Sequence, residues 1–280
     1  MSTKIIARKD FDDARRSRMI LAIVSIFVLF ASLLVAAPEL FGDSTTDVST
    51  AEALSLTVIP AETLVPIVSL IVGYMAIVGE RQSGSIKMLL GFPHSRRDIV
   101  AGKLIGRTAV VGLGIVVGFT VAVLLGAVLY GSFPARDFAA LLGVTLYLAL
   151  VFVGFAVGVS AATSSRGTAM AIVVGMFIIF NAFWNLLTAL LLYVVEGSNA
   201  GEPTWYEFLV SLSPMAAYES AARTVMDVEI LPLFSGPTSE AAVSGDPFFL
   251  QDWFGFVILA VWMFTPLAFG YWRFSRADLG

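Results

Sequence analysis

The sequence predicts an all-α membrane protein with six transmembrane helices. Of its 280 residues 58% are apolar and only 14% are charged, and the apolar residues gather in long runs without a charge. Soluble domains are far less apolar, and a helix needs about 20 apolar residues to cross the hydrocarbon core of a bilayer. We therefore expect a single transmembrane domain that covers residues 1–280.

Five apolar runs reach that length by themselves. The run 63–79 is shorter and becomes long enough when residues 58–62 extend it into the interface. The expected spans are 19–37, 58–79, 108–130, 138–161, 168–195 and 254–272. The first span is longer than the apolar part of a typical signal peptide, so we expect it to remain uncleaved.

The basic residues predict the orientation of the chain. With the amino terminus inside, the cytosolic segments are 1–18, 80–107, 162–167 and 273–280, and they hold 15 of the 17 Lys and Arg residues. Fifteen of the 21 acidic residues lie in the outer segments. Because cytosolic loops of membrane proteins are enriched in Lys and Arg, both termini are expected in the cytosol.

The amino-terminal arm, residues 1–18, mixes basic residues with Ile5, Ile6 and Phe11. This composition favours an amphipathic helix at the inner membrane surface, with its Arg side chains toward anionic headgroups. The alternative is a solvated basic tail that only enforces the topology.

The charged segment 80–107 between the second and third spans is the most informative part of the chain. It carries six of the 17 basic residues. Ile86, Leu89 and Leu90 follow the i, i+3, i+4 spacing and give a short helix one apolar stripe. Pro93 ends this helix, because the residue before a proline disfavours the α conformation.

A second helix is predicted to follow. Ser95 and Asp98 fit the capping box that opens a helix, which should run through Lys103 and Arg107 into the third span. A helix, a proline turn and a capped helix form an ordered segment rather than a flexible linker. Such an ordered segment is suited to bind a partner protein in the cytosol.

The longest segment between two spans, 196–253, lies on the outer side in this topology. Within this segment, residues 205–234 are too apolar to form a solvated loop. Ser213 and Pro214 are expected to open a short helix, since serine caps helices and proline suits a first turn. We therefore expect short helices at, or dipping into, the outer leaflet.

Missing residue types exclude several functions. The Gly102-Lys103 pair lacks the upstream glycine of a Walker A motif. The chain has no cysteine and one histidine, which excludes thiolate or His-cluster metal sites and Cys or Ser-His nucleophiles. Paired acids inside spans, expected of ion-coupled transporters, are also missing, and Glu62 is expected at the outer interface. We expect no enzyme activity of its own, no catalytic residue, no metal and no directly bound cofactor.

Asn181 and Asn185 of the fifth span share one helical face at i, i+4, with Trp184 beside them. Hydrogen bonding between helices of the same chain is one interpretation. The other is that these residues line a substrate path or a dimer seam.

The charged segment resembles the signature region of the ABC-2 type transporter permeases, and within that family the NosY-like group. The basic arm, the six spans and the Ser213-Pro214 segment are also similar to the family. The residues that carry the resemblance, in the family's order and spacing, are Glu80, Arg81, Ser83, Gly84, Ser85, Ile86, Leu89, Leu90, Pro93, Arg96, Asp98, Ile99, Gly102, Lys103 and Arg107.

The resemblance implies a function in the plasma membrane. The chain would be the transmembrane subunit of an ATP-driven ABC transporter, with export as the usual direction. A separate P-loop ATPase subunit would bind its cytosolic face and hydrolyse the ATP, and a second copy of the permease would complete the unit. The partners would be these subunits and the lipid bilayer, with no nucleic acid.

The resemblance also assigns the coupling residues. The helix 82–92 would be the coupling helix, seated in a groove of the ATPase by its apolar stripe. Arg96 and Arg97 would add charge contacts or orient on headgroups. The full set for ATPase coupling is Glu80, Arg81, Ser83, Gly84, Ile86, Leu89, Leu90, Pro93, Arg96, Arg97 and Lys103.

Two alternatives stay open at this point. A channel or secondary transporter that uses no nucleotide would need polar residues inside the spans, and Asn181 and Asn185 are the main ones. A non-transporting membrane scaffold would make equal use of an ordered cytosolic segment. Nucleotide-dependent transport in vesicles separates the transporter from the scaffold. The sequence identifies no substrate.

Overall fold

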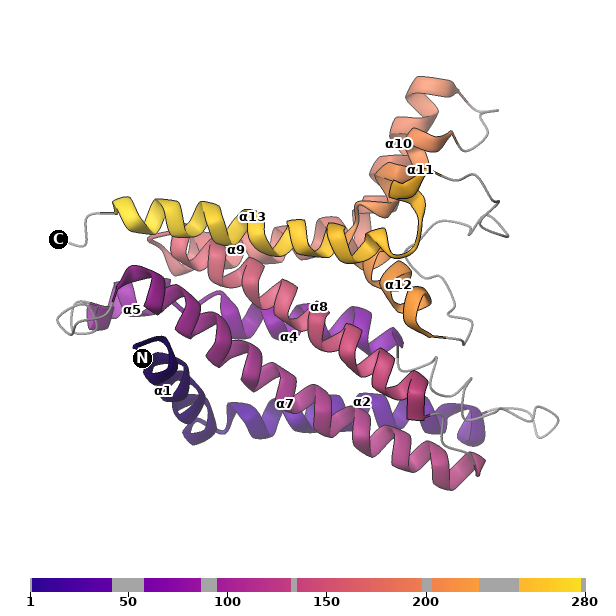
Figure 1. Cartoon of the computed structure of the whole chain (residues 1–280), viewed down its shortest axis with the longest axis horizontal. Helices are drawn as coiled ribbons and strands as arrows, with labels where there is room; N and C mark the ends of the chain where they lie inside the picture. Colours follow the sequence, from indigo (N-terminus) through magenta and orange to yellow (C-terminus); the bar gives the residue numbers. More distant parts are fainter. Residues whose placement is uncertain are drawn as a thin grey trace.

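The computed structural model describes residues 2–41, 58–86, 95–131, 135–197, 203–226 and 247–277, and every regular element in these residues is helical. Six helical segments are long and apolar enough to cross a membrane, which confirms the predicted number. Figure 1 shows most of them side by side, although the second half of the fifth segment, α10 (Trp184–Glu196), turns away from the bundle; both chain termini lie at one end. We call this the terminal end and the opposite end the far end.

The described elements follow the predicted order. The spanning segments are α2 (Met19–Phe41), α4 (Val58–Gly73) with α5 (Val78–Ser83), α7 (Arg96–Tyr130), α8 (Ala135–Ala162), α9 (Arg166–Ile178) continuing through the π-helical turn η1 (Ile179–Phe183) into α10 (Trp184–Glu196), and α13 (Phe254–Arg276). The shorter elements are α1 (Ser2–Arg16), α11 (Thr204–Ser211), α12 (Pro214–Val225) and the 3-10 turn η2 (Phe248–Leu250).

Helix α7 begins inside the charged segment, as the capping box predicted. The Ser95 hydroxyl accepts from the Asp98 backbone N–H at 3.2 Å, and the Asp98 carboxylate accepts from the Ser95 N–H at 3.1 Å. The helix then continues unbroken for 35 residues. At 1.5 Å per residue it is about 50 Å long, so it exceeds the hydrocarbon core of about 30 Å. Its first turns therefore extend beyond the core.

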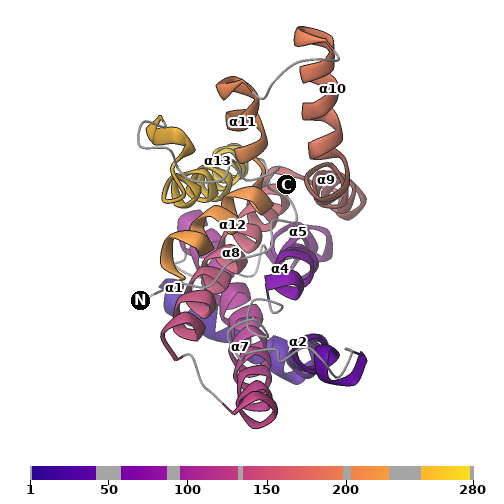
Figure 2. The same cartoon turned by 90° about the vertical axis from the view of Figure 1, so that its right-hand side faces the viewer.

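Helices α7 and α8 form the centre of the bundle (Figure 2). Helices α1 and α2 pack on α7, whereas α4 and α13 pack on α8. Two glycine pairs, Gly114 with Gly118 on α7 and Gly154 with Gly158 on α8, have the i, i+4 spacing that lets helix backbones approach closely. A Cβ at Gly114 or Gly118 would overlap α2, and one at Gly158 would overlap the α13 backbone at Pro266.

The second span is broken, whereas the sequence predicted one helix over 58–79. Helix α4 ends at Gly73, and α5 starts at Val78 after a turn. The buried Ser160 hydroxyl of α8 accepts from the backbone N–H groups of both Ile77 and Val78, each at 3.0 Å. A restarted helix has N–H groups without partners, and water cannot satisfy them inside a membrane. Ser160 satisfies two of them, so the break depends on a neighbouring helix.

The predicted short helix after Ser213 is confirmed. The Ser213 hydroxyl accepts from the Met215 N–H, and Pro214 occupies the first turn of α12. Most of α12 is buried, including the large side chain of Tyr218. It lies at the far end against α8 and α13. Helix α12 is therefore enclosed by protein rather than laid on the surface of the bundle.

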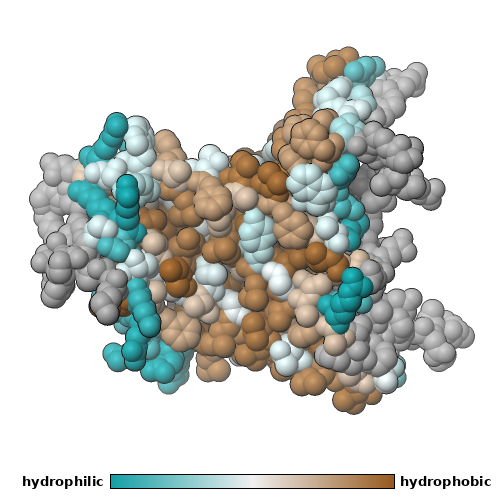
Figure 3. Space-filling view, viewed as in Figure 1, coloured by the Kyte–Doolittle hydropathy of each residue, from teal (hydrophilic) through white to brown (hydrophobic). Residues whose placement is uncertain are grey.

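On the face that Figure 3 shows, apolar side chains form a broad band across the middle of the bundle, and most of the hydrophilic side chains lie at the terminal end. Large apolar residues are exposed on helices from both edges of the bundle, among them Leu29 of α2, Leu186 of α10 and Phe264 of α13. Such a contiguous apolar surface indicates contact with lipid or another protein.

The contact between α8 and α13 generates a stability prediction. Gly158→Ala places a methyl group against the backbone of Pro266, and overpacking of this kind costs about 1–3 kcal/mol. We expect the thermal unfolding midpoint in detergent to fall by several degrees. Gly143→Ala is the control, because nothing lies within 4 Å of a Cβ added there on the same helix. An equal midpoint for the two variants would contradict the close α8–α13 contact.

Candidate functional site

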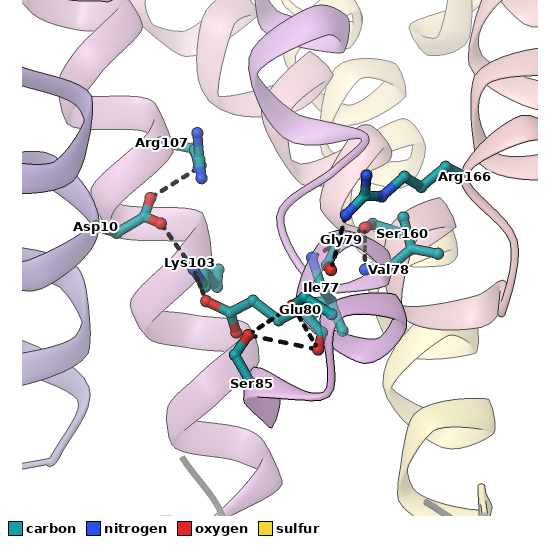
Figure 4. A network of polar contacts seen from close by, with 11 residues as sticks. Asp10, Ile77, Val78, Gly79, Glu80, Ser85, Lys103, Arg107, Ser160 and Arg166 are labelled. Carbon is teal, nitrogen blue, oxygen red and sulfur yellow. Dashed lines mark hydrogen bonds and ion pairs between the residues drawn. The ribbon is translucent and has the colours of Figure 1, made fainter. Parts of the chain in front are cut away.

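A buried ionic network joins three helices at the terminal end (Figure 4). The Lys103 ammonium of α7 lies 2.8 Å from the Asp10 carboxylate of α1 and 2.6 Å from the Glu80 carboxylate of α5. The Arg107 guanidinium contacts the other oxygen of Asp10, with 2.8 Å between Nε and Oδ2. The Lys103 side chain is 7% exposed and that of Asp10 is 2% exposed. Two cations thus balance two carboxylates, and Lys103 and Asp10 at the centre of the network are buried.

Helix α1 reaches this network because α7 presents two glycines to it. A Cβ at Gly102 would lie 2.7 Å from the Ile6 side chain, and one at Gly106 would lie 2.9 Å from the Cβ of Asp10. The absence of these two side chains lets the α1 backbone approach α7 closely. Asp10 can then enter the interface at a depth where Lys103 meets it. The buried face of α1 therefore packs against α7. It consists of Ile6, Asp10 and Ala14.

Helix α5 is fixed on its other side to the end of α8 and the turn that follows it. The Arg81 guanidinium donates to the Thr163 carbonyl at 2.9 Å. The Arg166 guanidinium donates in the opposite direction, to the Gly79 carbonyl at 3.2 Å. Charged donors give stronger hydrogen bonds than neutral ones. Together with Ser160 and Glu80, these bonds attach α5 to three neighbours.

The first turn of α7 is attached to α13. The Arg96 guanidinium donates to the carbonyls of Phe274 and Ala277, and it lies 5.4 Å from the centre of the Phe274 ring. The Arg97 guanidinium donates to the Tyr271 hydroxyl at 2.9 Å. Both side chains, for which the sequence predicts contacts with a partner or with headgroups, thus have partners inside the chain.

The remaining predicted coupling residues divide into two groups. Ser83 and Gly84 are exposed at the end of α5, and Ile86 is buried. Gly84 adopts a positive φ of 75°, a backbone region that glycine occupies without strain. The stripe residues Leu89 and Leu90, and Pro93 with them, lie outside the described residues.

Sequence reasoning missed Asp10 and Ser160, which carry much of this arrangement. Asp10 lies in an arm that the pattern assigned to the membrane surface, and Ser160 lies inside an apolar span. One signal was present: Gly102 and Gly106 have the same i, i+4 spacing as the two glycine pairs in the third and fourth spans. That spacing predicts a close helix neighbour but does not identify it.

The three candidate residues of the fifth span lie in different surroundings. Asn181 falls in η1 and has a buried amide nitrogen without a hydrogen bond, whereas Asn185 is exposed. The Trp184 indole donates to the Leu209 carbonyl at the end of α11, 3.0 Å away. The π-helical turn separates the two asparagines, which an unbroken α-helix would align.

An apolar hollow lies beside this turn. No charged side chain takes part in its lining, which consists of Leu70, Val151, Phe152, Phe155, Met176, Phe177, Phe180, Pro214 and Trp262. These residues come from α4, α8, α9, η1, α12 and α13. The hollow therefore lies between α4, α8, α9 and α13, next to the far-end helix α12.

Comparison with known proteins identifies the family. A family model described as ABC-2 family transporter protein matches residues 4–279. The chain belongs to the ABC-2 transporter family. It is 28% identical to the probable ABC transporter permease protein NosY of Pseudomonas aeruginosa over 287 aligned positions, which cover 98% of each chain. It is 29% identical to the protein of the same description from Stutzerimonas stutzeri, over 76% of this chain and 78% of the relative.

Membership in the ABC-2 family makes this chain the transmembrane subunit of an ABC transporter and a multi-pass protein of the plasma membrane. The matched region includes nearly all of α1 and the whole of α13. The ionic network and the contacts to α13 therefore lie within the ABC-2 permease domain.

Removal of Lys103 tests the network in this ABC-2 permease. Lys103→Met leaves Asp10 and Glu80 with one cation between them, and loss of one partner from a buried ion pair costs about 3–5 kcal/mol. We expect a corresponding loss in the free energy of unfolding. The exposed Lys9→Met should change it by less than about 0.5 kcal/mol.

The double variant Glu80→Gln/Lys103→Met restores the charge balance, because Asp10 keeps Arg107. We expect it to be more stable than Lys103→Met, and a thermodynamic cycle over the single variants measures the coupling. Strict additivity would contradict a direct interaction between Glu80 and Lys103.

Proposed function

We propose that this chain lines the substrate path of an ATP-driven exporter and receives its driving motion from a separate P-loop ATPase bound at the terminal end. The ATPase subunit binds and hydrolyses the nucleotide, and the permease needs no cofactor of its own. Two copies of the permease and two of the ATPase form the working unit in this proposal.

The observation that carries the proposal is the attachment of α5 to the rest of the bundle. The coupling segment begins at Glu80, and that residue is bonded to Lys103 on α7. Arg81, the next residue, is bonded to the turn after α8. A displacement of this segment by a partner is thereby transmitted to both central helices. A free loop would not transmit it.

The charge distribution supports a cytosolic location for the terminal end. The basic residues of α1, α7 and the end of α13 gather there, and Lys and Arg favour the cytosolic side. On this orientation Lys4, Arg8 and Lys9 of α1 are exposed beside the inner leaflet, where anionic headgroups attract them.

The transport step is a change of population between two access states. The ATPase pair binds ATP better in its closed form, so ATP shifts the permease toward the state that the closed form favours. Because α5, α7 and α8 are joined by the bonds described above, they move as one body. Helices α11 and α12 cover the far end of the path.

The fifth span is our candidate for the dimer seam or the path wall. It is the least covered of the six spans by its own chain, with 11% of its most apolar window buried against 67% for α8. Asn181, Trp184 and Asn185 lie at its middle. A second permease copy on this span would give the exposed Asn185 amide a polar environment that lipid cannot supply.

Purification from native membranes tests the proposed function. The tagged permease, extracted in mild detergent, should bring with it a P-loop ATPase in stoichiometric amount, identified by mass spectrometry. Reproducible recovery of the intact permease without an ATPase would favour the channel or scaffold alternatives.

Leu89→Asp and Leu90→Asp test the coupling helix. A carboxylate in the predicted apolar stripe should prevent seating in the ATPase groove, so the ATPase is lost from the purified complex while membrane insertion stays normal. Ser17→Asp, at an exposed position near the α1–α2 junction, adds the same charge elsewhere and should keep the ATPase bound. Normal complex formation and transport by both leucine variants would reject the coupling-helix assignment.

A further inference from the structure

One side of helix α13 is apolar and exposed from its middle to its last turns. Val261 and Phe264 lie in the middle of the helix, and Phe269 and Trp272 continue the exposed side toward the terminal end. At 3.6 residues per turn these four side chains fall within about 140° of the helix circumference. Helix α13 lies along one edge of the bundle in Figure 1. This side of α13 is therefore suited to contact with lipid acyl chains.

Two guanidinium groups lie against neighbouring rings where this surface ends. The Arg276 guanidinium carbon lies 4.7 Å from the centre of the Trp272 ring. The Arg97 guanidinium of α7 lies 5.7 Å from the centre of the Tyr271 ring and donates to its hydroxyl. A cation–π contact holds each guanidinium in place. Because a guanidinium has five N–H donors, most of those on Arg97 and Arg276 remain for a ligand.

These two cations lack an acidic partner in the described part of the chain, where neither forms an ion pair with a carboxylate. Asp98, which follows Arg97, instead accepts from the hydroxyl groups of Thr3 and Ser95. Arg273 adds another exposed basic side chain to the last turn of α13. Basic residues at the end of a transmembrane helix attract anionic headgroups.

The far end of the sixth span has exposed aromatic residues but a different charge. Phe248 and Trp253 are exposed there, and the Arg223 guanidinium lies 3.2 Å from the Asp252 carboxylate. Aromatic side chains favour both membrane interfaces irrespective of headgroup charge. The two ends of α13 therefore differ in the headgroup that they favour, and the terminal end favours a negative one.

We propose that the last turns of α13 and the first turn of α7 bind one anionic phospholipid of the leaflet at the terminal end. The phosphate-containing headgroup lies between Arg97 and Arg276, and the acyl chains lie along Phe269 and Phe264. From Arg276 to Phe264 the helix rises about 18 Å, which exceeds the roughly 15 Å depth of one hydrocarbon leaflet. This surface is therefore long enough for the chains of one lipid.

An anionic phospholipid uses both features of this surface, whereas other ligands use one. Inorganic phosphate would bond to the guanidinium groups, which match phosphate oxygens in geometry, but it would leave the apolar side of α13 unused. A neutral phospholipid would cover the apolar side and leave the arginines without a counter-charge. The bound headgroup adds a contact between α7 and α13. This inference goes beyond the proposed transport function and does not depend on an ATPase.

Native mass spectrometry of the full chain, titrated in detergent with phosphatidylglycerol or phosphatidylcholine, tests the site. The wild type should hold one phosphatidylglycerol more tightly than phosphatidylcholine, and inorganic phosphate at the same concentration should not displace it. Arg97→Gln/Arg276→Gln should weaken phosphatidylglycerol binding about thirty-fold, as the loss of two basic residues beside anionic headgroups predicts. Phosphatidylcholine binding should stay unchanged.

Lys4→Gln/Lys9→Gln is the matched control, because it removes two exposed cations of α1 at the same end of the bundle. This variant should keep the wild-type affinity for phosphatidylglycerol. Equal losses in the two double variants would show diffuse attraction and overturn the proposal. Equal wild-type affinities for the two lipids, or displacement of the lipid by phosphate, would also overturn it.

Arg276→Gln alone separates lipid binding from folding, because the contact of Arg276 with the Trp272 ring lies within one helix. This variant should bind phosphatidylglycerol about five-fold more weakly than the wild type. Its thermal unfolding midpoint without added lipid should equal that of the wild type. An unchanged affinity for phosphatidylglycerol overturns the proposal.

Brominated lipids locate the site, because bromine on an acyl chain quenches the fluorescence of a tryptophan that the chain contacts. In nanodiscs, brominated phosphatidylglycerol should quench the wild type more than brominated phosphatidylcholine at the same mole fraction. This difference should persist in Trp253→Phe and vanish in Trp272→Phe. Its survival in Trp272→Phe overturns the proposal, and the proposed transport function would be unaffected.

Discussion

A polar group buried away from water must find its partner within the protein, and this constraint organises the structure. Water is not present to compensate a broken helix or a buried charge. The interrupted second span is possible because Ser160 accepts from Ile77 and Val78. Lys103 is possible at its depth because Asp10 and Glu80 both reach it. Each partner comes from another helix, so each of these hydrogen bonds or ion pairs also fixes how two helices pack.

The two ends of the bundle satisfy the constraint in different ways. At the terminal end two cations and two carboxylates neutralise one another. At the far end the Arg223 guanidinium of α12 lies 3.2 Å from the Asp252 carboxylate, which precedes α13. The network thus joins three helices, whereas the single pair joins α12 to the start of the sixth span.

Under the proposed function, close helix contacts would carry a displacement from one end of the bundle to the other. Helices α7 and α8 run the length of the bundle (Figure 1), and glycines bring α1 and α2 against α7 and α13 against α8. Closely packed helices are not compressible, so they move as rigid bodies. A displacement of α5 therefore reaches the far end through the central helices, where α12 rests on α8 and α13.

The sequence by itself determined the fold class, the number and order of the spans, the start of α7 and the start of α12. These features depend on local signals: apolar runs, the Ser95–Asp98 capping box and the Ser213-Pro214 start. The residues of the charged segment also indicated the family. Only the tertiary structure decided that Asp10 meets Lys103, that Ser160 supports a helix break and that Arg96 meets the end of α13. Each of these pairs joins residues on different helices, and no spacing along the chain specifies which polar group will supply a partner across a helix contact.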